Sequence, residues 1–252
     1  MSYDISKVLN MALSQDGYME KAKAYKDNVE VLKSKDQGVG QDNITIYWKD
    51  LAPGMQGGQW CNCFVNWCFT MAYGLAEAKK LLCTEGGWSF YTPTSSSYFK
   101  KRGQWYTTPQ AGDVIYFKNS TRICHVGIVT NVDKSKVYTI EGNTSFTKGM
   151  VSNGGCVRQK SYSLKSTYIA GYGRPNYSGT VAATTTRATI GLGSTGADVR
   201  YLHKKLRALK YGVSENNDTF DSLTEQCVKH FQKVNKLEVD GICGPKTWAC
   251  IG

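Results

Sequence analysis

The sequence of 252 residues predicts an α+β protein with two domains. Three observations indicate this class. Apolar residues recur with helical spacing in the first hundred residues, and they alternate with a period of two after Pro109. A Thr-rich segment near residue 180 separates this part from a shorter block that has only helical spacing. Helices followed by a run of antiparallel strands are typical of the α+β class.

In the first part, a helix is expected over residues 4–13, where four apolar residues share one face. Residues 20–43 are polar and interrupted by glycine, which indicates a loop. A second helix is expected to begin within residues 57–60, because the apolar positions from Phe64 to Ala76 follow helical spacing.

Strands are expected after Pro109 wherever apolar residues alternate. A turn is expected at residues 133–135, and a last strand beginning near Tyr168 closes the domain. The strands before and after this turn cover residues 114–117, 126–132 and 137–140.

A linker is expected over residues 178–189, because this segment is small, polar and without periodicity. It separates a first domain, residues 1–177, from a second domain, residues 190–252. The second domain is expected to contain three short helices, of which the second spans 222–236 and the third begins near Pro245. The apolar face of the first helix is expected to contain Val199, Leu202, Leu206 and Leu209. The inward residues of the second helix are expected to be Leu223, Cys227, Val228 and Phe231.

Composition excludes several classes of protein. Hydrophobic residues make up 41% of the chain, which is enough for a packed core and excludes wholesale disorder. No apolar run is as long as a membrane helix, so we expect no integral membrane association. The first residues show no basic segment followed by a long apolar stretch, so we expect synthesis in a host cytoplasm without a signal peptide.

The chain is basic, with 31 Lys and Arg against 20 Asp and Glu. A net charge of +11 favours polyanionic partners. No run of five basic residues and no nucleic-acid-binding motif occurs, so we expect no nucleic-acid partner. Nine cysteines are an odd number, and synthesis in a reducing compartment disfavours a disulfide framework.

Four residues of the first domain are candidates for catalysis. Cys61 lies at the expected start of the second helix, where the helix dipole and amide donors favour a thiolate. His125 precedes one strand, and Glu141 and Asn143 follow the next. If the hairpin is centred on residue 134, the side chain of His125 lies opposite Asn143 and diagonal to Glu141. Cys, His and a polar third residue form the nucleophile, base and orienting group of acyl transfer, and either Glu141 or Asn143 could contact the imidazole.

Four ordered blocks carry a resemblance to a known family. They are residues 60–67 (WCNCFVNW), 112–117 (GDVIYF), 125–129 (HVGIV) and 140–143 (IEGN). Together they resemble the CHAP domain, the cysteine, histidine-dependent amidohydrolase/peptidase family, which is related to NlpC/P60 enzymes. The resemblance spans roughly residues 5–175 and implies a papain-like catalytic domain with a central antiparallel sheet.

This resemblance implies that Cys61 is the nucleophile, that His125 is the general base, and that Glu141 and Asn143 are the orienting groups. Some members of the family carry a calcium loop of acidic residues before the nucleophile. Here the preceding stretch offers only Asp50, so we expect no metal and no cofactor.

Structural roles are the alternative for the cysteines. Cys63, Cys68, Cys83 and Cys124 are expected to be buried structural residues. A zinc site that includes Cys61 is disfavoured because the C-x-C-x4-C spacing is unusual for zinc, and residues 61 and 63 of a helix point about 200° apart.

The second domain carries its own resemblance. Residues 196–202 (GADVRYL), 231–237 (FQKVNKL) and 239–248 (VDGICGPKTW) resemble the peptidoglycan-binding family 1 domain. This resemblance implies a small three-helix domain whose partner is bacterial peptidoglycan. His203 and His230 lie on its expected helices and are interpreted as structural rather than catalytic.

A thiol-dependent acyl-transfer domain joined to a wall-binding domain predicts a peptidoglycan hydrolase similar to phage endolysins, which acts on the cell wall. Among the reactions that members of this family catalyse, the N-acetylmuramoyl-L-alanine amidase reaction is favoured because it is frequent in the family. The alternatives are a peptidoglycan peptide endopeptidase and a non-catalytic cell-wall-binding protein.

Overall fold

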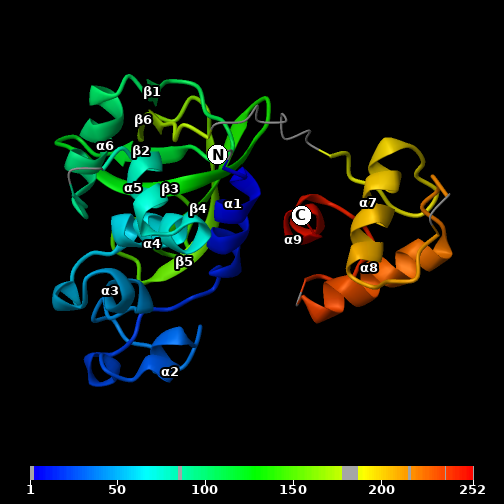
Figure 1. Ribbon diagram of the computed structural model, residues 1–252, viewed down its shortest axis with the longest axis horizontal. Coiled ribbons are helices and arrows are strands. Elements are labelled where there is room, and N and C mark those ends of the chain that lie inside the picture. Colours follow the sequence, from blue (N-terminus) through cyan, green and yellow to red (C-terminus); the bar gives the residue numbers. More distant parts are fainter. Residues whose placement is uncertain (1–2, 85–86, 178–186, 215–216, 236, 252) are drawn as a thin grey trace. The chain divides into compact units, whose positions relative to one another are not determined.

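The computed structural model describes residues 3–84, 87–177, 187–214, 217–235 and 237–251. The chain forms two compact units, residues 1–182 and 183–252 (Figure 1). Most of the linker expected over residues 178–189 lies outside the described residues. Each unit is described here by itself.

The first helix, α1 (Ile5–Ser14), matches the helix expected over residues 4–13. It begins after Asp4, whose carboxylate accepts a hydrogen bond from the backbone N–H of Ser6. The expectation of a loop over residues 20–43 was wrong in part, because this segment includes η1 (Lys23–Tyr25) and α2 (Val29–Lys33). These helices are three and five residues long, too short to give a periodic apolar pattern.

The second expected helix is present as α4 (Cys61–Tyr73). It ends earlier than the apolar pattern suggested because Gly74 has φ +83°, which breaks the helix before α5 (Leu75–Leu81). The apolar pattern did not reveal three further helical segments of this unit. They are α3 (Ile46–Leu51), η2 (Pro53–Met55) and α6 (Thr92–Lys101).

Six strands form one sheet in the order β1-β6-β2-β3-β4-β5, and every neighbouring pair is antiparallel. The α+β class with a central antiparallel sheet is therefore confirmed. The strands are β1 (Trp105–Tyr106), β2 (Val114–Lys118), β3 (Ile123–Val132), β4 (Lys136–Thr144), β5 (Cys156–Ser163) and β6 (Ile169–Gly173).

The hairpin of β3 and β4 has the expected register in its inner part. Ile128 pairs with Ile140, as a centre at residue 134 requires. A bulge between Val129 and Asn131 shifts the register by one residue near the turn.

Both faces of the sheet are packed, and α1 and α4 contribute to the core on one of them (Figure 1). The approach of α4 is close: an added Cβ at Gly142 of β4 would lie 2.5 Å from Cβ of Phe64. The opposite face has its own apolar cluster, formed by Ile115, Phe117, Val129, Val137, Tyr162 and Tyr172.

The second unit contains three helices, as expected: α7 (Ala197–Ala208), α8 (Ser222–Val234) and α9 (Pro245–Ile251). Two of the expected inward residues were wrong. Leu209 is exposed because α7 ends before it, and Leu223 is exposed because the buried face of α8 begins at Thr224. Within the described ranges, no helix is long and apolar enough to cross a bilayer.

Candidate active site

Cys61 is the first residue of α4, and its side chain is buried with 4% exposure. The first N–H groups of a helix have no acceptor within the helix, so they can stabilise negative charge at this point. The preceding residue, Trp60, is buried, and its indole N–H donates to Oε2 of Glu20 at 2.9 Å. Trp67 is also buried and donates to Asp50 at 2.7 Å, so both tryptophans belong to the core rather than to an open groove.

His125 and Glu141 form a buried pair on neighbouring strands. Nε2 of His125 lies 3.0 Å from Oε2 of Glu141, and both side chains are fully buried. The ring of His125 also lies beside Phe117, with 5.8 Å between the ring centroids. Because Glu141 occupies Nε2, the nitrogen that remains for a thiol is Nδ1.

Cys61 and Glu141 together control the charge of the imidazole. Burial by itself would lower the pKa of His125, but hydrogen bonding with Cys61 and with Glu141, and the charges of both, raise this pKa to about 9. Nδ1 is buried and forms no well-aligned hydrogen bond to any residue that the structure describes. Cys61 thus influences the imidazole electrostatically, and Nδ1 is the ring nitrogen left for it.

Of the two candidate orienting groups, Asn143 makes its recorded hydrogen bonds with groups other than His125. Its Nδ2 donates to Oδ1 of Asn153 at 3.0 Å and to Oδ1 of Asn43 at 3.3 Å. Asn143 has φ +57°, so the chain leaves extended geometry there, and the recorded pairing with β3 ends at Ile128. The side chain therefore turns away from the place opposite His125 that regular pairing would have given it.

Asn143 instead contributes to a connection between β4 and the start of α4. Its Oδ1 accepts a hydrogen bond from the backbone N–H of Gly155 at 3.2 Å. The carbonyl oxygen of Gly155 accepts the backbone N–H of Glu20 at 2.8 Å. Glu20 in turn holds the indole of Trp60, the neighbour of Cys61.

Three residues around Glu141 were missed from the sequence. The hydroxyl groups of Thr139 and Tyr162 donate to Glu141, and Gly127 leaves the space that its side chain occupies. Only Gly127 gave a usable signal, because an isolated glycine within an apolar strand indicates a close approach of another group. The hydroxyl of Tyr162 reaches Glu141 only through the pairing of β4 with β5, and β5 was not predicted.

Among the described residues, which include all nine cysteines, no disulfide occurs, and Cys63, Cys68, Cys83 and Cys124 are buried as expected. Burial raises the pKa of Cys63 and Cys68 well above the usual value, which disfavours the thiolate that a zinc site needs. In the part of the chain that the structure describes, no group of His, Cys, Asp and Glu is arranged to hold a metal ion.

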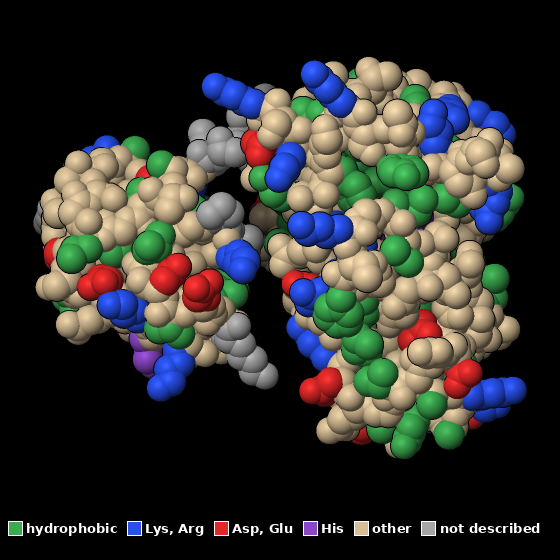
Figure 2. Space-filling model, turned by 180° about the vertical axis from the view of Figure 1, so that it is seen from behind, with side chains coloured by type: hydrophobic (Ala, Val, Ile, Leu, Met, Phe, Trp, Pro, Cys, Tyr) green, Lys and Arg blue, Asp and Glu red, His purple; other side chains and the backbone are tan. Residues whose placement is uncertain are grey.

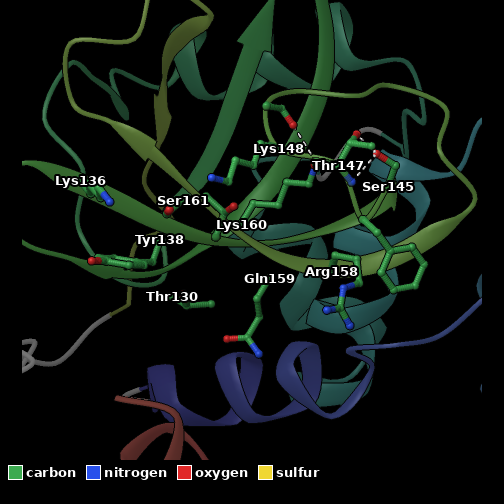
Figure 3. A pocket seen from close by; sticks show the side chains of 13 residues that line it. Thr130, Lys136, Tyr138, Ser145, Thr147, Lys148, Arg158, Gln159, Lys160 and Ser161 are labelled. Carbon is green, nitrogen blue, oxygen red and sulfur yellow. Dashed lines mark hydrogen bonds between the residues drawn. The ribbon is translucent and has the colours of Figure 1, made fainter. Parts of the chain in front are cut away.

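A separate cavity of about 550 Å³ lies beside β4, β5 and the loop of residues 145–149 (Figure 3). Four cationic side chains line it, and no acidic residue is among its lining residues. The cations are Lys136, Lys148, Arg158 and Lys160. Lys160 also holds the loop, since its Nζ donates to the carbonyl oxygens of Thr147 and Gly149.

The two histidines of the second unit each contact a hydroxyl group of a neighbouring residue. His203 is buried against Thr224, with 2.8 Å between Nε2 and Oγ1. Nδ1 of His230 lies 3.2 Å from the hydroxyl of Tyr211.

Solved structures resemble parts of the chain. A Burkholderia AP3 phage endolysin is 38% identical over 26% of this chain and 25% of its own, with a TM-score of 0.25. A Clostridioides difficile peptidoglycan-binding protein, solved with glutamine hydroxamate, is 25% identical over 46% and 70% of the two chains, with a TM-score of 0.27. Ly7917 is 16% identical over 68% and 62%, with a TM-score of 0.41. The chain thus spans about a quarter of the length of the endolysin.

No curated protein sequence matches the chain. Two domain families do. The CHAP domain family matches residues 53–143, and the family described as a putative peptidoglycan binding domain matches residues 195–251. The first match contains Cys61, His125 and Glu141, and the second covers the three helices of the smaller unit. The chain therefore joins a CHAP domain, which holds the buried histidine and carboxylate, to a putative peptidoglycan-binding domain.

Proposed function

We propose that the protein is a peptidoglycan hydrolase that cleaves an amide bond of the bacterial cell wall through a Cys61 acyl-enzyme. The observation that carries this proposal is the buried pair of His125 and Glu141, 3.0 Å apart, with Cys61 acting on the same imidazole. The presence of a putative peptidoglycan-binding domain in the same chain supports the wall as substrate.

The reaction begins with proton transfer from the thiol of Cys61 to Nδ1 of His125. The thiolate attacks the amide carbonyl carbon and forms a C–S bond, and the carbonyl oxygen gains the negative charge. The backbone N–H of Cys61 and its neighbours at the start of α4 stabilise this charge. His125 then gives its proton to the leaving amine as the C–N bond breaks.

Water completes the cycle. His125 removes a proton from water, and the resulting hydroxide equivalent attacks the thioester carbon. The C–S bond breaks, the acyl group leaves as a carboxylic acid, and His125 returns its proton to the sulfur, which restores the thiol of Cys61. Throughout the cycle Glu141 accepts the Nε2–H of His125, which keeps Nδ1 available for proton transfer.

The second domain and the charge of the chain support action on an insoluble anionic polymer. A binding domain on the same chain raises the local concentration of the wall at the catalytic domain. Figure 2 shows Lys and Arg side chains distributed over the visible face of the larger unit. Together with the cationic cavity and the net charge of +11, they favour approach to an anionic surface.

We infer that the bond is the one between N-acetylmuramic acid and L-alanine, as in phage endolysins that act as amidases; the support is the frequency of this reaction in the family. Mass spectrometry of fragments released from purified walls tests this choice. An amidase releases peptides that begin with L-alanine and leaves free lactyl groups on the glycan. Peptides cut internally, with the sugar–peptide bond intact, would instead establish an endopeptidase.

Clearing of a wall suspension tests the hydrolase itself. The parent chain is expected to reduce the turbidity of purified walls, and Cys61→Ala is expected to abolish this effect. Binding of Cys61→Ala to walls, measured by co-sedimentation, should remain because the second domain is unchanged. Binding without clearing by the parent chain would establish a non-catalytic wall-binding protein instead.

A further inference from the structure

The two carboxylate oxygens of Glu141 are held by different hydroxyl groups. Thr139, two residues earlier on β4, donates to Oε1 at 2.5 Å. Tyr162 of β5 donates to Oε2 at 3.1 Å, and Oε2 is also the oxygen that pairs with His125. Glu141 and Thr139 are fully buried, and Tyr162 is buried. Bulk solvent therefore has no access to the carboxylate, and the protein supplies its hydrogen bonds.

The sheet register brings these groups together. Along β4, Thr139 and Glu141 point to the same face because side chains alternate along a strand. Val137 of β4 pairs with Tyr162 of β5, so Tyr162 belongs to that face as well. The arrangement around the carboxylate is therefore built from adjacent antiparallel strands rather than from a flexible loop.

We propose that Thr139 and Tyr162 are positioning residues that hold the carboxylate of Glu141 in place and fix the oxygen that it presents to His125. The inference rests on the proposed function. A carboxylate held beside Nε2 accepts the hydrogen on that nitrogen, which leaves Nδ1 to take the proton of Cys61. If the carboxylate moved away from Nε2, the imidazole hydrogen would be free to settle on Nδ1, and this tautomer cannot accept the thiol proton.

Several charged or ionisable groups face Glu141 from the neighbouring strands. His125 faces it from β3, and Arg158 is its backbone partner on β5. Lys160 of β5 interacts with its charge at longer range. Burial, followed by the charge of Glu141, raises the pKa of Tyr162, so this hydroxyl stays protonated and remains a donor across the working pH range.

The test measures the reactivity of Cys61 without any wall substrate. The full chain, Thr139→Val and Tyr162→Phe are treated with iodoacetamide across a pH series, and peptide mass spectrometry reads the alkylation of residue 61 alone. Each variant is expected to shift the pH midpoint of alkylation upward and to slow alkylation at pH 7 about tenfold. In wall clearing, kcat is expected to fall by a similar factor while KM is retained.

Two matched variants serve as controls. Thr139→Ser keeps the hydroxyl and is expected to restore the parent alkylation profile. Tyr138→Phe removes a hydroxyl from the adjacent position of β4, where it donates to Asp133 at 2.7 Å, and is expected to leave the profile unchanged. Circular dichroism and thermal unfolding establish that each variant is folded.

A folded Thr139→Val or Tyr162→Phe whose midpoint is unchanged or lower would overturn the positioning roles. If Tyr162→Phe fails to fold, the comparison of Val with Ser at position 139 decides the question. A parent chain that clears no walls would defeat the proposed function, while the alkylation profiles would still test the inference. Normal clearing with unchanged profiles would defeat the inference alone.

Discussion

Gly127 and Glu141 face each other on β3 and β4 so closely that only hydrogen fits as a side chain at position 127. A Cβ added to Gly127 would lie 2.6 Å from Cγ of Glu141 and 3.0 Å from the carbonyl oxygen of Ile140. Real Cβ atoms do not approach other heavy atoms this closely, so either the carboxylate or the backbone would have to move. Gly127 thus determines where the carboxylate that pairs with His125 can lie.

Gly127→Ala is therefore expected to displace Glu141 and to lower kcat for wall clearing at least tenfold, because the carboxylate loses its alignment with His125. Overpacking in this buried strand should also lower the free energy of unfolding by about 1–3 kcal/mol. Gly54→Ala is the matched control, since nothing lies within 4 Å of the added Cβ there. Equal clearing rates for the two variants would contradict the prediction.

Cys61 is expected to be the only thiol whose loss abolishes hydrolysis. Cys61→Ser should reduce clearing at least a thousandfold, since a serine hydroxyl is not ionised by this imidazole. Cys63→Ala, two residues further along α4, should retain clearing and lose only about 1 kcal/mol of stability, as expected for a small buried side chain. Clearing that depends on Cys63 and not on Cys61 would show that a different cysteine is the nucleophile.

The charge of His125 should make stability depend on pH. Its pKa is about 9 in the folded chain, above the ordinary 6.5, because Cys61 and Glu141 outweigh the effect of burial. Protonated His125 therefore stabilises the fold fully below pH 6.5, and this contribution is lost as the pH rises through about 9. The difference in Tm between the parent and His125→Gln should shrink from pH 6 to pH 10. A constant difference would mean that the imidazole does not titrate in this window.

The cationic cavity should contribute to the capture of anionic walls. Lys136→Glu combined with Lys148→Glu is expected to weaken wall binding at low salt about tenfold and to have little effect near 1 M salt, where charges are screened. The control, Lys7→Glu with Lys165→Glu, makes the same change in net charge at two residues that do not line the cavity. Equal losses for both pairs, measured by co-sedimentation, would assign the effect to net charge rather than to the cavity.

The sequence was most informative where local patterns determine structure. Periodicity and turn residues predicted three features of the first unit. These are the start of α4 at Cys61, the hairpin of β3 and β4, and the inner register that places Glu141 near His125. The choice between Glu141 and Asn143 did not follow, because strand alternation gives both residues the same face. Only the positive φ of Asn143 separates them, and this backbone conformation leaves no mark in the apolar pattern.

Other features depend on contacts between distant segments. Strand β5 alternates charged and polar residues with few apolar ones, so the pattern did not identify it, and Tyr162 was missed with it. Helix α6 has the sequence TPTSSSYFKK, whose polar residues conceal a helix that buries Phe99. Leu209 and Leu223 had helical spacing, but both are exposed. Leu209 lies beyond the end of α7, and the buried face of α8 begins at Thr224, after Leu223.

The chain of contacts from Asn143 through Gly155 and Glu20 to Trp60 has a further consequence for how the protein works. These hydrogen bonds connect β4, which carries Glu141, to the start of α4, which carries Cys61. They do so through segments that lie far apart in the sequence. The relative placement of these two elements is thus settled when the polypeptide folds. In the proposed reaction, a substrate would therefore meet two elements that these hydrogen bonds already connect, which reduces the reorganisation needed before bonds are made.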